Sequence, residues 1–375
     1  MDPEEPVDPE CVEEAAAAEP GGGAEQPVDP EQPVDPEQPV DPAAIRAAIR
    51  AAVTATGLLP ASRAVVVMLS GGRDSVCLLD LGCSLCAAGS VHALHVNYGL
   101  RAEAEQDEQH CVALCERLGI ALEVVRVSRP AGEVGNLHGW ARDVRYREAA
   151  RLAETHDALV AAGHTATDQV ETILYRLAAS PGRRALLGMP AAEGRLIRPL
   201  LTLTREQTAA YCRARGLGWR EDASNDSQQY ARARVRAGLA PALRAVHPAA
   251  EANVLRTAEL LREETQLLDG LVDAELSAAK LAGPSGTSGP GDGPGVSIER
   301  LEQMPVALAR LVVIRLAEDA CGSYVPQAGG RVAEILALAR RGGRAELHVG
   351  ALVSAVIEGG VLSMRTIPPR HQPRG

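Results

Sequence analysis

A glycine-rich segment, Ser70-Gly-Gly-Arg-Asp-Ser75, directly follows an apolar run and precedes a predicted helix. Gly71 and Gly72 have no Cβ atom, so backbone N–H groups can approach an anion closely, and the start of the helix adds a positive dipole end. Ser70 and Ser75 add hydroxyl donors. The segment predicts a phosphate-binding loop, although not one of the Walker type, because no Gly-Lys-Ser/Thr sequence occurs.

Asp74 is an acidic residue inside this predicted phosphate-binding loop. Its carboxylate would repel a phosphate group unless a divalent cation lay between the two, so we expect Asp74 to bind Mg²⁺. The alternative interpretation of the segment is an ordinary strand-to-helix turn with a capped helix.

Four short apolar runs rich in Val and Leu alternate with segments of helical pattern. The runs are 64–69, 91–96, 120–127 and 158–162, and the helical segments lie around 75–88, 102–117 and 139–155. This alternation predicts an α/β fold, in which a parallel sheet is covered by helices on both faces.

Composition divides the chain into five predicted parts. Residues 1–42 are an acidic, Pro-rich repeat that we expect to be disordered, because frequent Pro interrupts helices and sheets alike. The other predicted parts are the α/β domain (43–230), a helical subdomain (231–281), a flexible Gly- and Pro-rich linker (282–296) and a small C-terminal domain of mixed type (297–375).

The predicted C-terminal domain contains two helical segments followed by a hairpin. The helical segments cover about 297–320 and 330–341. The hairpin runs from Glu346 to Met364 and turns at Gly359-Gly360, a pair that suits a tight two-residue turn.

Charge is distributed unevenly along the 375 residues. Residues 1–42 contain fourteen Asp and Glu and no Lys or Arg, whereas the remainder has 38 basic residues against 35 acidic ones. The part expected to fold is therefore mildly basic and compatible with a nucleic-acid partner.

No apolar run approaches the ~20 residues of a membrane span and no signal-peptide pattern occurs, so we expect a cytoplasmic protein with no membrane partner.

Eight cysteines in such a chain are expected to be reduced. Two pairs, Cys83/Cys86 and Cys111/Cys115, could together supply four metal ligands. Both pairs fall in predicted apolar helices, where a free Cys commonly acts as a small buried residue, and we favour that interpretation.

The segment SGGRDS after the first apolar run resembles the PP-loop of the N-type ATP pyrophosphatases. Further motifs follow in order: HVNYGLR at 95–101, Asn136 to Tyr146, GHTATDQVET at 163–172, RPLL at 198–201 with Thr204-Arg-Glu206, EDASND at 221–226, and Arg232-Ala-Arg-Val-Arg236. Taken together, over about residues 45–245, the set resembles the tRNA(Ile)-lysidine synthetase family.

This resemblance implies a two-step reaction that uses ATP and Mg²⁺. ATP would adenylate the C2 oxygen of the wobble cytidine in a tRNA(Ile) with a CAU anticodon, releasing pyrophosphate, and free L-lysine would then attack C2 and release AMP. The attacking amine must lose its proton, and an unperturbed Lys has a pKa of about 10.4, so a nearby carboxylate or a desolvated pocket is needed.

The resemblance also assigns candidate site residues. The candidate catalytic residues are Asp74, Asp168 and Glu171. The candidate nucleotide-binding residues are Ser70, Gly71, Gly72, Arg73, Asp74, Ser75, His95, Asn97 and His164, and the candidate contacts to tRNA or nucleotide are Arg101, Arg142, Arg145, Arg205, Arg232, Arg234 and Arg236.

Some of these assignments have structural alternatives. Asp168 and Glu171 are three residues apart at a predicted helix start, so both lie on one face, where they could hold lysine or a metal or simply cap the helix. His164 could contact the nucleotide or serve the fold. Arg142 and Arg145 could equally form a solvated helix face.

The sequence departs from the family pattern at two informative positions. Tyr98 stands where the family usually has His, and Thr167 stands where it usually has the first of two adjacent Asp. The missing Asp could have contacted lysine or a metal. That contact is lost here unless Asp74 and Glu171 are sufficient to provide it.

Two other functions remain open from the sequence. A PP-loop tRNA thiolase would use the paired cysteines as cluster ligands or sulfur carriers, and a non-catalytic relative would bind tRNA without releasing pyrophosphate. The sequence also leaves open whether the chain forms a homodimer.

Overall fold

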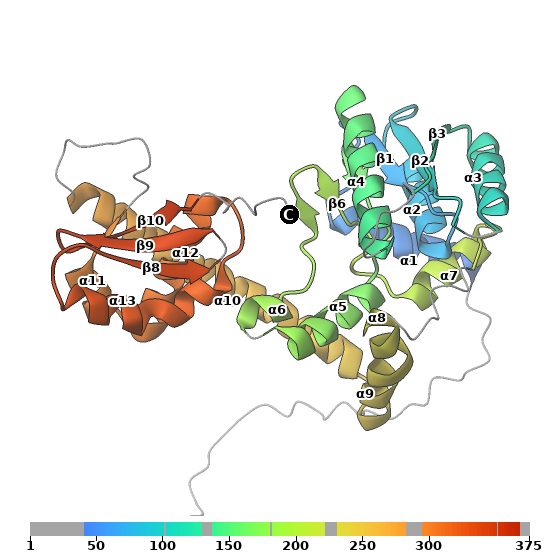
Figure 1. Cartoon of the computed structure of the whole chain (residues 1–375). Helices are drawn as coiled ribbons and strands as arrows, with labels where there is room; N and C mark the ends of the chain where they lie inside the picture. The colour runs from blue at the N-terminus through green and yellow to red at the C-terminus, as the bar shows by residue number, and fades with distance from the viewer. Residues whose placement is uncertain are drawn as a thin grey trace, which may run out of the picture. The chain divides into compact units, whose positions relative to one another are not determined.

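The computed structural model describes residues 41–100, 103–129, 137–180, 182–221, 231–282, 295–350 and 352–367. The predicted tail (1–42) and the predicted linker (282–296) lie largely outside these ranges, and the candidate residue Arg101 lies outside them as well. In the ranges described, the chain forms one six-stranded and one four-stranded sheet (Figure 1).

The six-stranded sheet has the order β3-β2-β1-β4-β6-β5. Its strands are β1 (Val65–Met68), β2 (Val91–Asn97), β3 (Ala121–Arg126), β4 (Leu159–Ala161), β5 (Ala192–Glu193) and β6 (Leu196–Ile197). β1 pairs in parallel with β2 and β4, β2 with β3, and β4 with β6, while β5 is antiparallel to β6. The predicted parallel sheet is confirmed, and the short β5–β6 pair is an addition that the apolar runs did not predict.

Seven helices accompany this sheet within the described ranges. They are α1 (Pro42–Ala55), α2 (Arg73–Leu85), α3 (Ala104–Leu118), α4 (Leu137–Thr155), α5 (Ala166–Ala179), α6 (Arg183–Leu186) and α7 (Arg205–Ala214). The predicted helices around 75–88, 102–117 and 139–155 correspond to α2, α3 and α4.

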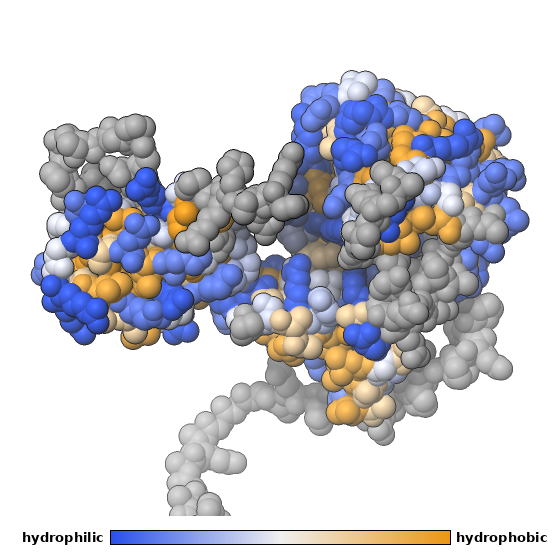
Figure 2. Space-filling model, in the orientation of Figure 1, coloured by the Kyte–Doolittle hydropathy of each residue, from blue (hydrophilic) through white to orange (hydrophobic). Residues whose placement is uncertain are grey.

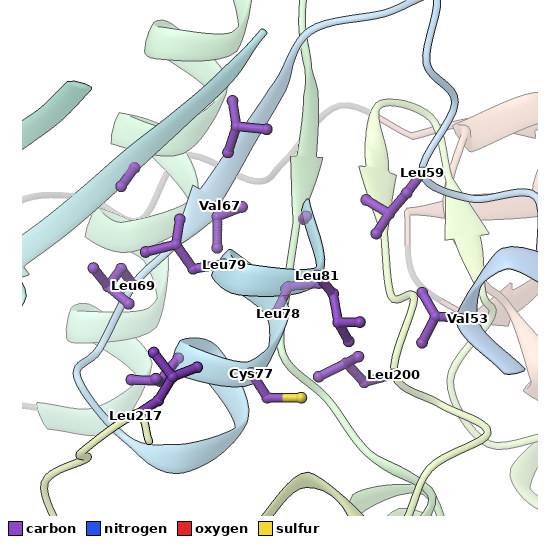
Figure 3. Packing of buried hydrophobic residues seen from close by; sticks show 14 of the residues in the cluster. Val53, Leu59, Val67, Leu69, Cys77, Leu78, Leu79, Leu81, Leu200 and Leu217 are labelled. Carbon is purple, nitrogen blue, oxygen red and sulfur yellow. The ribbon is translucent and has the colours of Figure 1, made fainter. Parts of the chain in front are cut away.

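The central strand β1 contributes alternate residues to two hydrophobic cores. Val65 and Val67, with Leu69 directly after the strand, pack with α1, α2, α3 and α7, and Figure 3 shows part of this cluster. Val66 and Met68 pack with α4 on the other face. Successive residues of a strand point to opposite faces, so this division confirms a sheet with helices on both sides.

A helical region follows the sheet. It comprises α8 (Ala231–Arg234), the π-helix η2 (Val235–Leu239), α9 (Ala240–Val246) and α10 (Ala250–Ala282). A small buried cluster joins it to α5 through Val170 and Leu174 of α5, Val235 of η2 and Ala240 of α9. This packing holds the arginine-rich segment 232–236 against α5.

The C-terminal region is of mixed type, as predicted. Its elements are β7 (Val296–Ser297), α11 (Ile298–Gln303), α12 (Val306–Cys321), the 3₁₀ helix η3 (Pro326–Arg331), α13 (Val332–Ala339), β8 (Ala345–Gly350), β9 (Val353–Glu358) and β10 (Val361–Thr366). The sheet is antiparallel in the order β7-β10-β9-β8.

Two details of the C-terminal prediction need correction. The segment 297–320 is two helices rather than one, because the chain between them is extended at Met304 and Pro305, and Pro305 is the N-cap of α12. The turn at Gly359-Gly360 is confirmed between β9 and β10, but the span from Glu346 holds three strands, since β8 ends at Gly350 with φ 121°.

Hydrophilic and hydrophobic residues are distributed unevenly over the surface. Figure 2 shows a largely hydrophilic face on α4 and hydrophobic residues gathered around α9. On α4, Arg142 and Arg145 are exposed, and near α9 Leu239 and Val246 are exposed. None of the helices described here is long and apolar enough to cross a membrane.

Candidate nucleotide and amine site

The predicted phosphate-binding loop connects the end of β1 to the start of α2. Gly71 has φ +82°, and a Cβ atom there would lie 3.2 Å from Cys111 Sγ. Ser75 Oγ donates to the Gly72 carbonyl at 2.8 Å and lies 3.1 Å from Ser70 Oγ. Gly72 is the N-cap of α2 and no side chain caps it, so the first N–H groups of α2 have no side-chain cap competing with an anion.

The end of β4 packs directly on this loop at Gly163. A Cβ atom on Gly163 would lie 3.1 Å from the Asp74 carbonyl carbon and 3.2 Å from the Ser75 nitrogen. Only glycine allows such an approach between two backbones without displacement. The loop after β1 and the segment after β4 therefore form one site.

Asp74 lies in the first turn of α2 with its side chain 21 % exposed. Thr208 Oγ1 donates to Asp74 Oδ1 at 2.5 Å, Arg73 Nε donates to the same oxygen at 3.3 Å, and Arg205 Nε lies 3.9 Å from Oδ2. Burial raises the pKa of Asp74 above its usual value, and the nearby Asp168 raises it further. A carboxylate is the kind of oxygen donor that Mg²⁺ prefers, and this one lies at the uncapped start of α2, so Asp74 fits the predicted Mg²⁺ ligand.

Asp168 lies in the first turn of α5 and has two roles in the structure. It forms a capping box with Thr165, because its Oδ2 accepts from the Thr165 nitrogen and the Thr165 hydroxyl, each at 2.9 Å. Its Oδ1 accepts from Arg205 Nη2 at 2.6 Å. Burial alone would raise the pKa of Asp168, but Arg205 and the Thr165 N–H bring it below its usual value. The capping alternative is therefore present, together with an ion pair.

Glu171 is the most buried of the three candidate acids, with its side chain 1 % exposed. Its Oε1 accepts from Arg205 Nη1 at 3.1 Å and from Arg236 Nε at 2.7 Å, and its Oε2 accepts from Arg236 Nη2 at 3.1 Å. Arg205, expected to contact tRNA or nucleotide, thus joins Glu171 to Asp168. Any cationic ligand of Glu171 must share it with two arginines or displace one of them.

Of the other arginines of the 232–236 segment, Arg232 contacts the first turns of α5. Arg232 Nη2 donates to Thr172 Oγ1 at 3.0 Å and to the Asp168 carbonyl at 3.4 Å. Arg234 is exposed on α8. Arg236 stands on the π-helix η2, a type of helix that frequently occurs at functional sites.

His95 and Asn97 occupy the end of β2. His95 Nδ1 lies 2.9 Å from the Leu69 carbonyl, so this nitrogen carries the proton and Nε2 is the acceptor of the neutral ring. Burial lowers the pKa of His95. Asn97 donates to Glu108 at 2.8 Å and accepts from the Gly99 nitrogen at 2.9 Å, so both ends of its amide already bond within the chain.

His164 follows β4 and is adjacent to the capping box of α5. Its Nδ1 is buried and has no hydrogen-bond partner among the residues that the structure describes. Burial lowers the pKa of His164 to about 4, and Arg198 and Arg232 act in the same direction. The ring is therefore neutral at pH 7.

Arg142 and Arg145 lie on the solvent side of α4. Arg145 Nε donates to the Tyr98 hydroxyl at 3.2 Å, and that hydroxyl donates to the Ala141 carbonyl at 2.8 Å. The Arg142 guanidinium lies 4.6 Å from the centre of the Tyr146 ring. Tyr98 thus joins the end of β2 to α4, and the contact of the two arginines with nucleotide stays a prediction.

Some residues of the site were not predicted from the sequence. Thr208 contacts Asp74. The sequence offered only one signal for this role, which is that Thr208 follows the motif Thr204-Arg-Glu206 and lies one helical turn after Arg205. The Arg220 nitrogen donates to the Gly71 carbonyl at 2.9 Å, and its side chain donates to Asp107 at 3.1 Å. Arg220 therefore braces the phosphate loop from outside.

The two cysteine pairs lie at the end of α2 and along α3. Cys111 and Cys115 are buried as expected, and burial raises their pKa to about 12 and about 11. Cys83 is exposed, contrary to expectation, and Cys86 is half-buried. Among the residues the structure describes, no group of three or more His, Cys, Asp or Glu side chains is arranged to hold a metal ion.

A phosphate-binding loop at the end of the central strand of a parallel sheet defines a nucleotide-binding α/β protein. The family model of the PP-loop domain matches residues 45–243, more than half of the chain. The chain therefore belongs to the PP-loop family.

Curated relatives of this chain carry a common name. The sequence is 40 % identical over 222 residues to a "tRNA(Ile)-lysidine synthase" of Pseudomonas fluorescens, covering 57 % of this chain and 50 % of the relative. It is 38 % identical over 311 residues to one of Symbiobacterium thermophilum, covering 78 % of this chain and 63 % of the relative. The chain spans about half the length of the Pseudomonas relatives it matches.

Among solved structures, the chain is similar to the U34-tRNA thiolase NcsA from Methanococcus maripaludis, which was solved with its [4Fe-4S] cluster. The TM-score is 0.51 at 19 % identity, covering 59 % of this chain and 80 % of that chain. At this identity the likeness supports the fold alone.

Proposed function

We propose that this protein is a tRNA(Ile)-lysidine synthetase. It adenylates the C2 oxygen of the wobble cytidine in a tRNA(Ile) with a CAU anticodon, using ATP and releasing pyrophosphate, and then joins the ε-amine of free L-lysine to C2 with release of AMP. The observation that carries the proposal is the cluster of Asp74, Asp168 and Glu171 beside an uncapped phosphate-binding loop. The names of the curated relatives support it.

The loop suits the binding of ATP. Its glycines leave the start of α2 open to an anion, and Arg73 adds a cation beside Asp74. Mg²⁺ bound at Asp74 would neutralise charge on the phosphates. Asp74 and the loop N–H groups would together orient the nucleotide so that its α-phosphate faces the cytidine.

The buried acids suit the second substrate. Asp168 has a pKa below its usual value, so it remains ionised and suits holding the cationic end of lysine. Glu171, held by two arginines, fixes the position of Arg205 beside the two aspartates of the cluster.

The arginines suit the tRNA. Arg232 and Arg234 are exposed on α8, adjacent to the acid cluster, and can reach phosphates of a docked anticodon stem. The mild excess of bases outside the acidic tail favours such a partner. Since ATP, lysine and tRNA are cytoplasmic, we place the reaction in the cytoplasm.

A pyrophosphate-release assay tests the proposal. Release should require both ATP and tRNA(Ile) with the CAU anticodon, lysidine should form only when lysine is present, and tRNA(Met) with the same anticodon should be a poor substrate. Asp74→Asn serves as the inactive control. Sulfur incorporation into tRNA, or tRNA binding without pyrophosphate release, would refute the proposal.

A further inference from the structure

Thr167 makes a contact between two helices of the candidate site. Its hydroxyl accepts a hydrogen bond from the Arg205 nitrogen at 3.2 Å. Arg205 is the first residue of α7, and the first N–H groups of a helix have no carbonyl partner within it. Thr167, from α5, supplies one of the missing acceptors.

The rest of the start of α7 is capped locally. Thr204 and Gln207 form a capping box, in which Thr204 Oγ1 accepts from the Gln207 nitrogen at 3.3 Å and Gln207 Oε1 accepts from the Thr204 nitrogen at 2.8 Å. These two bonds stabilise the helix without fixing its position on the sheet. The bond from Thr167 differs, because it joins α7 to α5.

A second bond supports the same junction. The Ala166 nitrogen donates to the Leu203 carbonyl at 2.7 Å, so the start of α5 also holds the segment that leads into α7. The two helix starts are therefore joined on both sides of Thr204.

The first turn of α7 carries the side chains that hold all three candidate acids. Arg205 bonds to Asp168 at 2.6 Å and to Glu171 at 3.1 Å, and Thr208 bonds to Asp74 at 2.5 Å. A shift of this turn would move one hydrogen-bonding partner of each acid at the same time. Thr167 is adjacent in sequence to Asp168, so it fixes α7 at the point where these partners are needed.

We propose that Thr167 is a positioning residue that fixes the start of α7 so that Arg205 and Thr208 hold the three acids in place. The inference rests on the proposed function for its kinetic readout. It also accounts for the missing acid of the sequence pattern, because a carboxylate at position 167 would accept the same N–H that the hydroxyl accepts. Position 167 then requires an acceptor rather than a charge.

Three variants test the proposal in the full chain. Thr167→Val keeps the side-chain shape without the acceptor, whereas Thr167→Ser and Thr167→Asp retain an acceptor. Thr155→Val is the matched control, because the Thr155 hydroxyl is exposed and donates to the Arg151 carbonyl within its own helix, α4. The measurements are the KM for lysine and kcat in pyrophosphate-coupled lysidine formation, and hydrogen exchange of the peptide that begins α7.

We expect Thr167→Val to raise the KM for lysine about three- to tenfold, the effect of one net hydrogen bond, and to speed exchange at the Arg205 amide. Thr167→Ser and Thr167→Asp should remain near wild type in both measurements, and Thr155→Val should change neither. An unchanged KM and unchanged exchange in Thr167→Val would overturn the proposal, as would a loss in Thr167→Asp as large as in Thr167→Val.

The exchange measurement keeps this inference separate from the proposed function. A wild-type protein that forms no lysidine would refute the function, while faster exchange in Thr167→Val alone would still support the positioning contact. If the wild-type protein forms lysidine and Thr167→Val has the same KM and the same exchange rate, only the role of the contact is refuted. If Thr167→Val does not fold, retention of KM and exchange by Thr167→Ser and Thr167→Asp supports the proposal, and a defect in both overturns it.

Discussion

His164 makes the stability of this protein sensitive to mild acid. Burial lowers its pKa to about 4, whereas the ring in an unfolded chain has a pKa of about 6.5. Between these two values the unfolded chain binds a proton that the folded chain does not. The free energy of unfolding therefore falls as pH decreases from 6.5 toward 4, and it is unaffected by this group above pH 7.

The expected size follows from the two pKa values. One unit of difference corresponds to about 1.4 kcal/mol, and the pair of values gives a loss of about 2.5 kcal/mol between pH 7.5 and pH 4.5. That is a large part of a typical unfolding free energy of about 5–15 kcal/mol. Burial is the main cause of the lowered pKa; the Asp168 carboxylate favours protonation of the ring, and Arg198 and Arg232 oppose it.

Urea unfolding at a series of pH values measures this effect. Between pH 7.5 and 4.5, the free energy of unfolding of His164→Gln should fall by about 2.5 kcal/mol less than that of the wild type, because the substituted side chain does not titrate. His348→Gln, on an exposed position of β8, is the matched control and should follow the wild type. Parallel pH curves for the wild type and His164→Gln would refute the account of His164 as a buried neutral ring.

Four other variants test the site. Asp74→Asn should abolish AMP formation while the circular dichroism spectrum stays unchanged; retained turnover would remove Asp74 from the reaction. Gly163→Ala should raise the KM for ATP about tenfold, because its Cβ would meet the Asp74 backbone at 3.1 Å, and an unchanged KM would mean that the loop yields freely. Asp168→Asn should raise the lysine concentration at half-maximal rate by at least about tenfold, because one charge-assisted hydrogen bond is lost. Equal lysine dependence would leave Asp168 as a helix cap only. Deletion of residues 1–40 should leave tRNA affinity and turnover nearly unchanged at physiological salt, because interactions between exposed charges are screened beyond ~8 Å. A folded but inactive product would contradict this.

The sheet could be predicted because its signal is local. The buried run of β1 is continuous and β-branched, and the predicted 64–69 differs from Val65–Met68 by one residue at each end. The β5–β6 pair escaped prediction because each strand has two residues, too few for any periodicity. The split at Pro305 was available from the sequence, since Pro favours the start of a helix over its interior.

The contacts within the candidate site could not be predicted in the same way. Arg205 is 34 residues from Glu171 in sequence and Arg236 is 65 residues from it, and no pattern of spacing relates them. Their meeting depends on the tertiary fold, which packs η2 against α5 and joins the starts of α5 and α7 by hydrogen bonds. The sequence located the acids, and the structure added that two arginines already neutralise the most buried one.

Sulfur transfer and amine ligation would require different side chains beside the phosphate-binding loop. Cys83 lies nine residues after Asp74 on the same helix, about 14 Å along its axis, at the end remote from the loop. Cys111 does lie next to Gly71, but it is fully buried and is therefore inaccessible to a substrate bound at the loop. The groups that do converge on the loop are three carboxylates and their arginines. This arrangement favours the ligation of an amine over thiolation.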